Sequence, residues 1–269
     1  MTHVRYVSAS RVQDLKRILN ARDIAIVETV AQLRFVSGAQ LRRIHVSSGT
    51  ALGNERVARK LLARLVELGV LDRLERRIGG PGPGGSEGYI YVLALGGQSL
   101  VHKRQMSARS RRRRVTAPGQ MFVSHTLALA EIHTRLIEAE RDGRWVIQER
   151  LAEPACWRRF TIAQGEQSIL KPDLAVRVAH DERRQSFLID VDRGTEGTRT
   201  LERRLRIYGQ YREHLRGSER RFPQVLWLAR TDKRVRVIAG ALGCLPEEAS
   251  GYFHVARFER AIEAITRLL

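Results

Sequence analysis

Cysteine is nearly absent from this chain of 269 residues, which contains only Cys156 and Cys244. Two cysteines at unrelated positions exclude a disulfide framework and a zinc knuckle. No apolar run approaches the ~20 residues needed to cross a bilayer, and the opening stretch MTHVRYVSASRV lacks the apolar segment of a secretory signal. These absences predict a reduced, cytoplasmic protein that does not associate with a membrane.

Acidic residues are scarce relative to basic ones, with 29 Asp and Glu against 48 Lys and Arg and a net charge of +19. The excess is uneven, because residues 1–118 carry 22 basic and 8 acidic residues whereas residues 119–269 carry 26 and 21. A basic first part followed by a nearly balanced second part favours binding of a polyanion, most simply double-stranded DNA, by the first part.

Three helical patterns and one hairpin pattern follow one another in the first part. The helices are predicted in ARDIAIVETVAQL (21–33), in SGAQLRRI (37–44) with Ser37 as the cap, and in NERVARKLLARLVELG (54–69) between Asn54 and Gly69. Two strand-like runs, VLDRLERRI and YIYVLAL, then flank the flexible tip GGPGPGGSEG. This order is typical of a winged helix-turn-helix domain, which we expect over residues 1–96.

The third helix is predicted to be the recognition helix, because apolar side chains, Val57 among them, fill one half of its wheel and basic side chains fill the other. The predicted DNA contacts are Arg56, Arg59, Lys60 and Arg64 on this helix, Arg76 and Arg77 on the wing, and Arg111, Arg112, Arg113 and Arg114 in a basic linker over residues 97–119. A winged helix can also bind proteins, and the linker can be a solvated hinge, so both alternatives stay open.

The second part, residues 120–269, is predicted to be a mixed α/β domain. A helix over 120–142 carries His125 and His133 on its apolar face and Glu131 on its solvated side. Strand-like runs follow at WVIQERL, LKPDLAVRVA and SFLIDV, the last two as a hairpin, and then a helix over 198–217 leads to a parallel strand near 225. KRVRVIAGALG fits either a helix or the sheet, and the chain closes with the strand YFHVARF and the helix ERAIEAITRLL.

Two acids share one face of the run FLIDVDRGTE, because Asp190 and Asp192 alternate with Ile189 and Val191. Like charges this close require a cation or hydrogen-bond donors if they are buried. Together with Asp173 after Pro172, they have the pattern of a PD-(D/E)xK nuclease, in which carboxylates hold Mg²⁺. The alternative is that Asp190 pairs with Arg204 or another arginine and that no metal binds.

The acids and the residues around them resemble the replication-relaxation family of plasmids and mobile elements. The resemblance rests on Asp173, on the run from Ile189 to Glu196, and on Arg204, Leu205 and Tyr208, and it extends over about residues 20–230. It implies a winged helix joined to a restriction-endonuclease-like α/β domain. Asp190 stands where the family more often has Glu, and Arg204 where it commonly has Lys.

Two functions are consistent with that resemblance. In the first, Asp173, Asp190, Asp192 and Arg204 nick or process DNA with Mg²⁺, supported by His125, Glu196 and Tyr208. In the second, the protein is a non-catalytic regulator or replication accessory factor whose second domain serves homodimer formation or binding of replication or transfer proteins. Both functions require binding of double-stranded DNA.

Overall fold

The computed structural model describes residues 7–74, 88–104, 119–162, 165–194, 197–216, 218 and 221–269. The chain is an α+β protein that forms two compact units, Met1–Thr134 (unit 1) and Arg135–Leu269 (unit 2). The division falls inside one continuous helix, α6 (Gln120–Arg141), whose first part belongs to unit 1. The sequence pattern instead predicts a domain boundary before this helix, at residues 97–119.

Unit 1 begins with four helices: α1 (Ala9–Ile18), α2 (Ala21–Leu33), α3 (Gly38–His45) and α4 (Ala51–Glu67). The predicted bounds of α2 are confirmed, and its start is a capping box in which Asn20 and Asp23 exchange hydrogen bonds. Ser37 caps α3 as predicted, in a second capping box with Gln40. Helix α1 was not predicted from the sequence.

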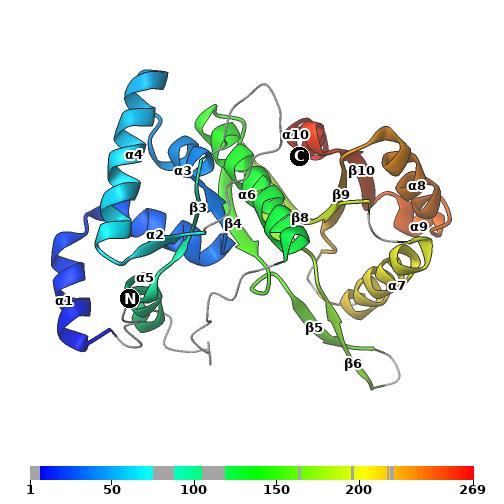
Figure 1. Ribbon diagram of the computed structural model, residues 1–269. Coiled ribbons are helices and arrows are strands. Elements are labelled where there is room, and N and C mark those ends of the chain that lie inside the picture. The colour runs from blue at the N-terminus through cyan, green and yellow to red at the C-terminus, as the bar shows by residue number, and fades with distance from the viewer. Residues whose placement is uncertain are drawn as a thin grey trace. The chain divides into compact units, whose positions relative to one another are not determined.

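Helix α4 starts four residues earlier than predicted. Thr50 is its cap, and the side chain of Asn54 instead bonds the backbone N–H and C=O of Gly49. Because the early turns project from the rest of unit 1 (Figure 1), Val57 is 45% exposed and does not join the buried face as predicted. That face consists of Ala58, Leu62 and Leu65. Gly69, with a positive φ of 70°, follows the helix as expected.

A small antiparallel sheet completes the described part of unit 1. Its strands are β1 (Val36–Ser37), β2 (Leu71–Arg73) and β3 (Ile90–Leu93), in the order β1-β3-β2. The predicted hairpin is therefore present as β2 and β3, and α5 (Leu95–Arg104) follows it. Arg76, Arg77 and the arginines at 111–114 lie outside the described residues.

Unit 2 is built on a mixed five-stranded sheet. Its strands, in spatial order, are β10 (Phe253–Arg257), β9 (Gln224–Ala229), β8 (Arg183–Asp192), β7 (Leu174–His180) and β4 (Val146–Ala152). The β7–β8 pair is the predicted antiparallel hairpin, and β9 lies parallel to β8 as expected after a crossover helix. The register sets Asp190 beside Trp227 and Asp192 beside Ala229.

The remaining elements of unit 2 are α7 (Thr198–Leu215), α8 (Asp232–Leu242), α9 (Glu247–Ser250), the short 3₁₀ helix η1 (Phe258–Arg260), α10 (Ala261–Leu268), and the two-stranded sheet β5 (Arg158–Thr161) and β6 (Gln167–Leu170). The segment KRVRVIAGALG, for which the sequence allowed two interpretations, is helical in α8. The β5–β6 pair is absent from the sequence predictions.

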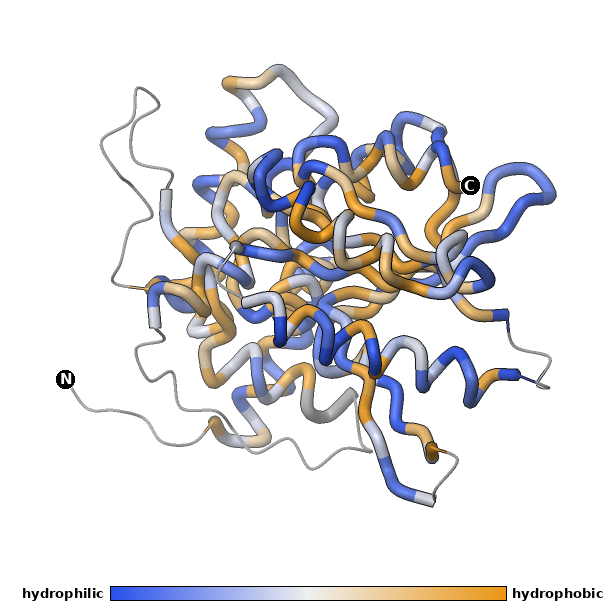
Figure 2. The backbone as a smooth tube through the Cα atoms, turned by 90° about the vertical axis from the view of Figure 1, so that its right-hand side faces the viewer, coloured by the Kyte–Doolittle hydropathy of each residue, from blue (hydrophilic) through white to orange (hydrophobic). Residues whose placement is uncertain are grey.

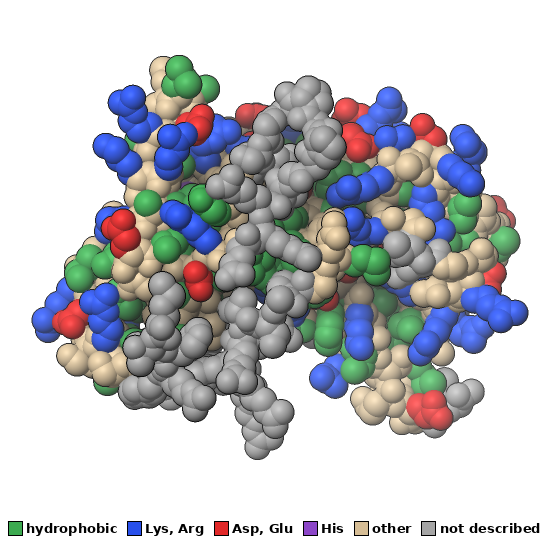
Figure 3. Space-filling model, in the orientation of Figure 1, with side chains coloured by type: hydrophobic (Ala, Val, Ile, Leu, Met, Phe, Trp, Pro, Cys, Tyr) green, Lys and Arg blue, Asp and Glu red, His purple; other side chains and the backbone are tan. Residues whose placement is uncertain are grey.

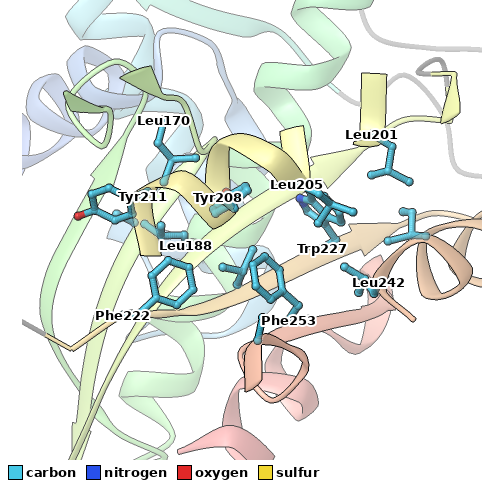
Figure 4. Close-up of a cluster of buried hydrophobic side chains, with 14 of the residues drawn as sticks. Leu170, Leu188, Leu201, Leu205, Tyr208, Tyr211, Phe222, Trp227, Leu242 and Phe253 are labelled. Atoms are coloured by element: carbon cyan, nitrogen blue, oxygen red, sulfur yellow. The ribbon is translucent and has the colours of Figure 1, made fainter. Parts of the chain in front are cut away.

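An apolar cluster between the sheet and helices α7 and α8 holds the acidic strand in place. Leu201, Leu205 and Tyr208 of α7 face Leu188 of β8 and Trp227 of β9 (Figure 4). Hydrophobic segments, orange in Figure 2, run through the interior of the fold. Asp190 and Asp192 project from the same face of β8 as Leu188, so the fold directs both acids toward α7 and α8.

Candidate functional site

Asp190 is completely buried and its carboxylate is bonded on both oxygens. Arg204 of α7 donates to Oδ1. The Tyr208 hydroxyl donates to Oδ2 over 2.6 Å, and Trp227 Nε1 donates to the same oxygen. Asp190 thus pairs with Arg204, which agrees with the interpretation that needs no metal.

Asp192, 5% exposed, has a separate arginine. Arg234 of α8 binds it with two parallel hydrogen bonds, Nε to Oδ1 at 2.8 Å and Nη2 to Oδ2 at 2.7 Å. The backbone N–H of Gly194 also donates to Oδ1, which closes the turn after β8. Sequence reasoning missed Arg234, because its position 42 residues downstream gives no local signal.

Asp173 is more exposed than the other two acids, and its Oδ2 accepts the backbone N–H of Val191 at 2.7 Å. This bond ties the loop before β7 to the end of β8. Burial raises the pKa of Asp190, Arg204 opposes the rise, and the nearby charge of Asp173 adds to it. Burial and the Asp190 charge raise the pKa of Tyr208, so this phenol remains a hydrogen-bond donor.

The arrangement of these acids does not fit a bound Mg²⁺. A magnesium ion needs several carboxylate oxygens directed at one point, whereas Asp190 and Asp192 direct theirs at Arg204 and Arg234. Within the described ranges, no group of three or more His, Cys, Asp or Glu side chains is placed to hold a metal ion. The magnesium site stays a prediction.

Of the three supporting residues predicted around the acids, Tyr208 is in direct contact with Asp190. His125 is half-buried in the part of α6 that belongs to unit 1, whereas the acids belong to unit 2. Glu196 lies outside the described residues. Glu131, expected to be solvated, instead accepts two hydrogen bonds from Arg43, one of 2.9 Å to each oxygen, and this ion pair joins α3 to α6 within unit 1.

The predicted DNA contacts on α4 differ in their surroundings. Arg56 and Lys60 are exposed, and in the described parts of the chain no acidic side chain pairs with them. Arg59 is exposed but pairs with Glu55 one turn earlier. Arg64 contacts both oxygens of the fully buried Asp23 at 2.5 Å and so joins α4 to the start of α2.

Basic side chains gather around the projecting end of α4 (Figure 3). Arg73 is the last residue of β2, and Tyr89 directly precedes β3. The Arg73 guanidinium lies 4.5 Å from the ring centre of Tyr89, and Tyr89 is 38% exposed. Unit 1 therefore presents cations and an aromatic ring on the two elements that the sequence analysis assigned to DNA contact.

A family model described as Replication-relaxation matches residues 27–225, and the chain belongs to this family. The match spans most of both units, from α2 to β9. Membership indicates a role in the replication or relaxation of a plasmid or mobile element. No curated protein and no solved structure matches the chain. Over the described residues, no helix is both long and apolar enough to cross a bilayer.

Proposed function

We propose that the protein binds double-stranded DNA of a plasmid or mobile element through unit 1, acting as a winged helix, and that it serves replication or relaxation as a non-cleaving factor. The observation that carries this proposal is the exposed basic face of α4. A helix with one buried face and one cationic face can enter the major groove while the hairpin lies along the backbone.

The exposed face of α4 has an order that suits this role. On a helical wheel, Gly53, Arg56 and Lys60 lie opposite the buried face, and the exposed Leu52 and Val57 lie on either side of them. Arginine and lysine neutralise phosphates or bind guanine, and apolar side chains contact the methyl group of thymine. Both kinds of contact are available in the first two turns.

Arg64 contributes to the same function indirectly. Its guanidinium is held by Asp23, and Asp23 also accepts the N–H of Asn20 at the start of α2. The pair therefore fixes α4 on α2 and aligns the exposed face. A direct phosphate contact by Arg64 stays a prediction.

The carboxylates of unit 2 support the non-cleaving part of the proposal. Each buried acid has an arginine partner from a different helix, and these pairs join α7 and α8 to the end of β8. We assign them the role of holding the unit 2 fold, which then serves as a platform for a second copy of the chain or for replication proteins.

The test is DNA binding by the full chain to a labelled duplex over a range of salt concentrations. In R56Q/K60Q we expect the slope of log K against log salt to become shallower by about 1.8, two phosphates at about 0.9 each. The matched control K16Q/R17Q removes two exposed charges from α1 of the same unit. It should bind like the wild type. Equal losses in both variants would reject α4 as the contact surface.

A further inference from the structure

Arginines follow the ends of both β8 and β9. The last pair of this parallel ladder is Asp192 with Ala229, so Arg193 and Arg230 come next on two neighbouring strands. Parallel neighbours lie about 4.8 Å apart, and side chains alternate between faces. Continuing this alternation, Arg193 and Arg230 share the face opposite Asp192, at the carboxyl edge of the sheet.

Among the residues that the structure describes, no acidic side chain pairs with either of these two arginines. Like charges at adjacent positions of a sheet destabilise it. The Nη1 atom of Arg193 is inaccessible and has no hydrogen-bond partner. Burial lowers the pKa of Arg193, and the nearby charge of Arg230 lowers it further. Described acids in this part of unit 2 have other partners: Asp192 binds Arg234, and both Asp232 and Glu259 bind Arg257.

An aromatic ring positions the second arginine. The guanidinium carbon of Arg230 lies 5.7 Å from the ring centre of Phe258, and that of Arg135 lies 5.3 Å from the same ring. Phe258 is itself buried, so its ring is a fixed surface for both groups. Arg135 Nη1 also donates to the carbonyl of Phe258 at 3.3 Å. Three guanidinium groups are thus brought to one edge of the sheet.

We propose that Arg193 and Arg230 form a binding site for one phosphate group at the carboxyl edge of β8 and β9. Guanidinium groups match the tetrahedral oxygens of phosphate in charge and hydrogen-bond geometry. Ligands of open α/β sheets bind at the carboxyl ends of parallel strands. The phosphate belongs either to a DNA backbone, in which case this site extends the proposed function to unit 2, or to a free phosphate or phosphorylated small molecule.

The first experiment measures free phosphate. Thermal unfolding of the full chain is followed by tryptophan fluorescence, because all three tryptophans, Trp145, Trp157 and Trp227, belong to unit 2. Sodium phosphate, compared with sodium chloride at equal ionic strength, should raise the wild-type midpoint by about 2–4 °C. The variants R193Q and R230Q should lose this rise. R184Q, which removes an exposed charge earlier on β8, should keep it.

A loss of the phosphate response in R193Q can be told apart from misfolding. Because R193Q removes one of two like charges, its unfolding midpoint in sodium chloride should be no lower than that of the wild type. The second experiment measures the salt dependence of duplex binding. In R193Q/R230Q the slope should become shallower by about 0.9 if one backbone phosphate occupies the site, whereas R184Q should match the wild type.

The two experiments separate the sources of the phosphate. A change in the duplex slope assigns the site to DNA, and a change in the phosphate response alone assigns it to free phosphate. If R193Q and R230Q keep the phosphate response of R184Q, and R193Q/R230Q keeps the duplex slope of R184Q, the site is refuted. A wild type that binds no DNA contradicts the proposed function, and the phosphate experiment then decides the site independently.

Discussion

Replacing Asp190 with asparagine removes one buried charge at almost constant volume. Arg204, whose side chain is 24% exposed, loses its carboxylate partner. Tyr208 and Trp227 both donate to Oδ2, and an amide nitrogen placed there accepts neither bond; the Tyr208 hydroxyl can turn to accept from it, but the Trp227 N–H is left without an acceptor. Breaking a buried ion pair from one side costs about 3–5 kcal/mol. Water can reach Arg204 and partly solvate its charge, so we expect Asp190→Asn to lower the free energy of unfolding by about 3 kcal/mol, the lower end of this range.

Urea unfolding followed by tryptophan fluorescence measures this loss in unit 2 alone, because unit 1 contains no tryptophan. Asp181→Asn is the matched control, since its side chain is 85% exposed in the β7–β8 turn. It should change the free energy of unfolding by less than about 0.5 kcal/mol. A loss below about 1 kcal/mol for Asp190→Asn would show that the three donors do not depend on this carboxylate.

The pH dependence of Arg204→Gln tests the same network from its other side. Arg204 lowers the pKa of Asp190 against the rise caused by burial, so its loss should raise that pKa further. A carboxyl group whose folded pKa is raised favours folding below its unfolded pKa, near 3.8, and this contribution is lost as pH rises through the folded pKa. The stability deficit of Arg204→Gln should therefore grow as the pH rises past the wild-type folded pKa of Asp190, which itself lies above 3.8. A deficit that shrinks with rising pH would contradict the assigned direction.

Three further predictions concern other residues. Arg64→Gln should destabilise unit 1 by about 2–4 kcal/mol, because it leaves the buried Asp23 without its cation; circular dichroism measures the loss, and a neutral effect would contradict it. Burial raises the pKa of Cys156 to about 12, so a thiol reagent at pH 8 should modify only the exposed Cys244 of the native chain and both cysteines in urea. Supercoiled plasmid should remain intact with the wild type and Mg²⁺ or Mn²⁺; nicking that disappears in Asp173→Asn would instead support the catalytic hypothesis.

Much of the fold could be predicted from local sequence pattern. The helix α2 and the caps at Ser37 and Gly69 follow from apolar spacing and from side chains that satisfy free backbone groups. The β7–β8 hairpin follows from alternation around a polar turn, and the parallel β9 from the crossover helix. In each case the residues that predict the element lie within the element or within a few residues of it.

The errors arise where tertiary context decides. Val57 fits the apolar side of the α4 wheel, but the helix extends beyond its neighbours there and the side chain is exposed. Glu131 lies on the polar side of its helix, yet it is paired because Arg43 approaches from α3. Arg234 is separated from Asp192 by 42 residues, and only the packing of α8 on the sheet brings the two together.

The two acids of β8 therefore avoid mutual repulsion by having different partners on different helices. Arg204 and Tyr208 of α7 bind Asp190, and Arg234 of α8 binds Asp192. The same strand end has the opposite charge balance on its other face, where Arg193 faces Arg230 without a described acid. A sheet edge neutralised on one face and cationic on the other directs anion binding to the second face. The acidic run that first suggests a metal site thus supports the fold, and the arginine that follows it is the better candidate for contact with a phosphate.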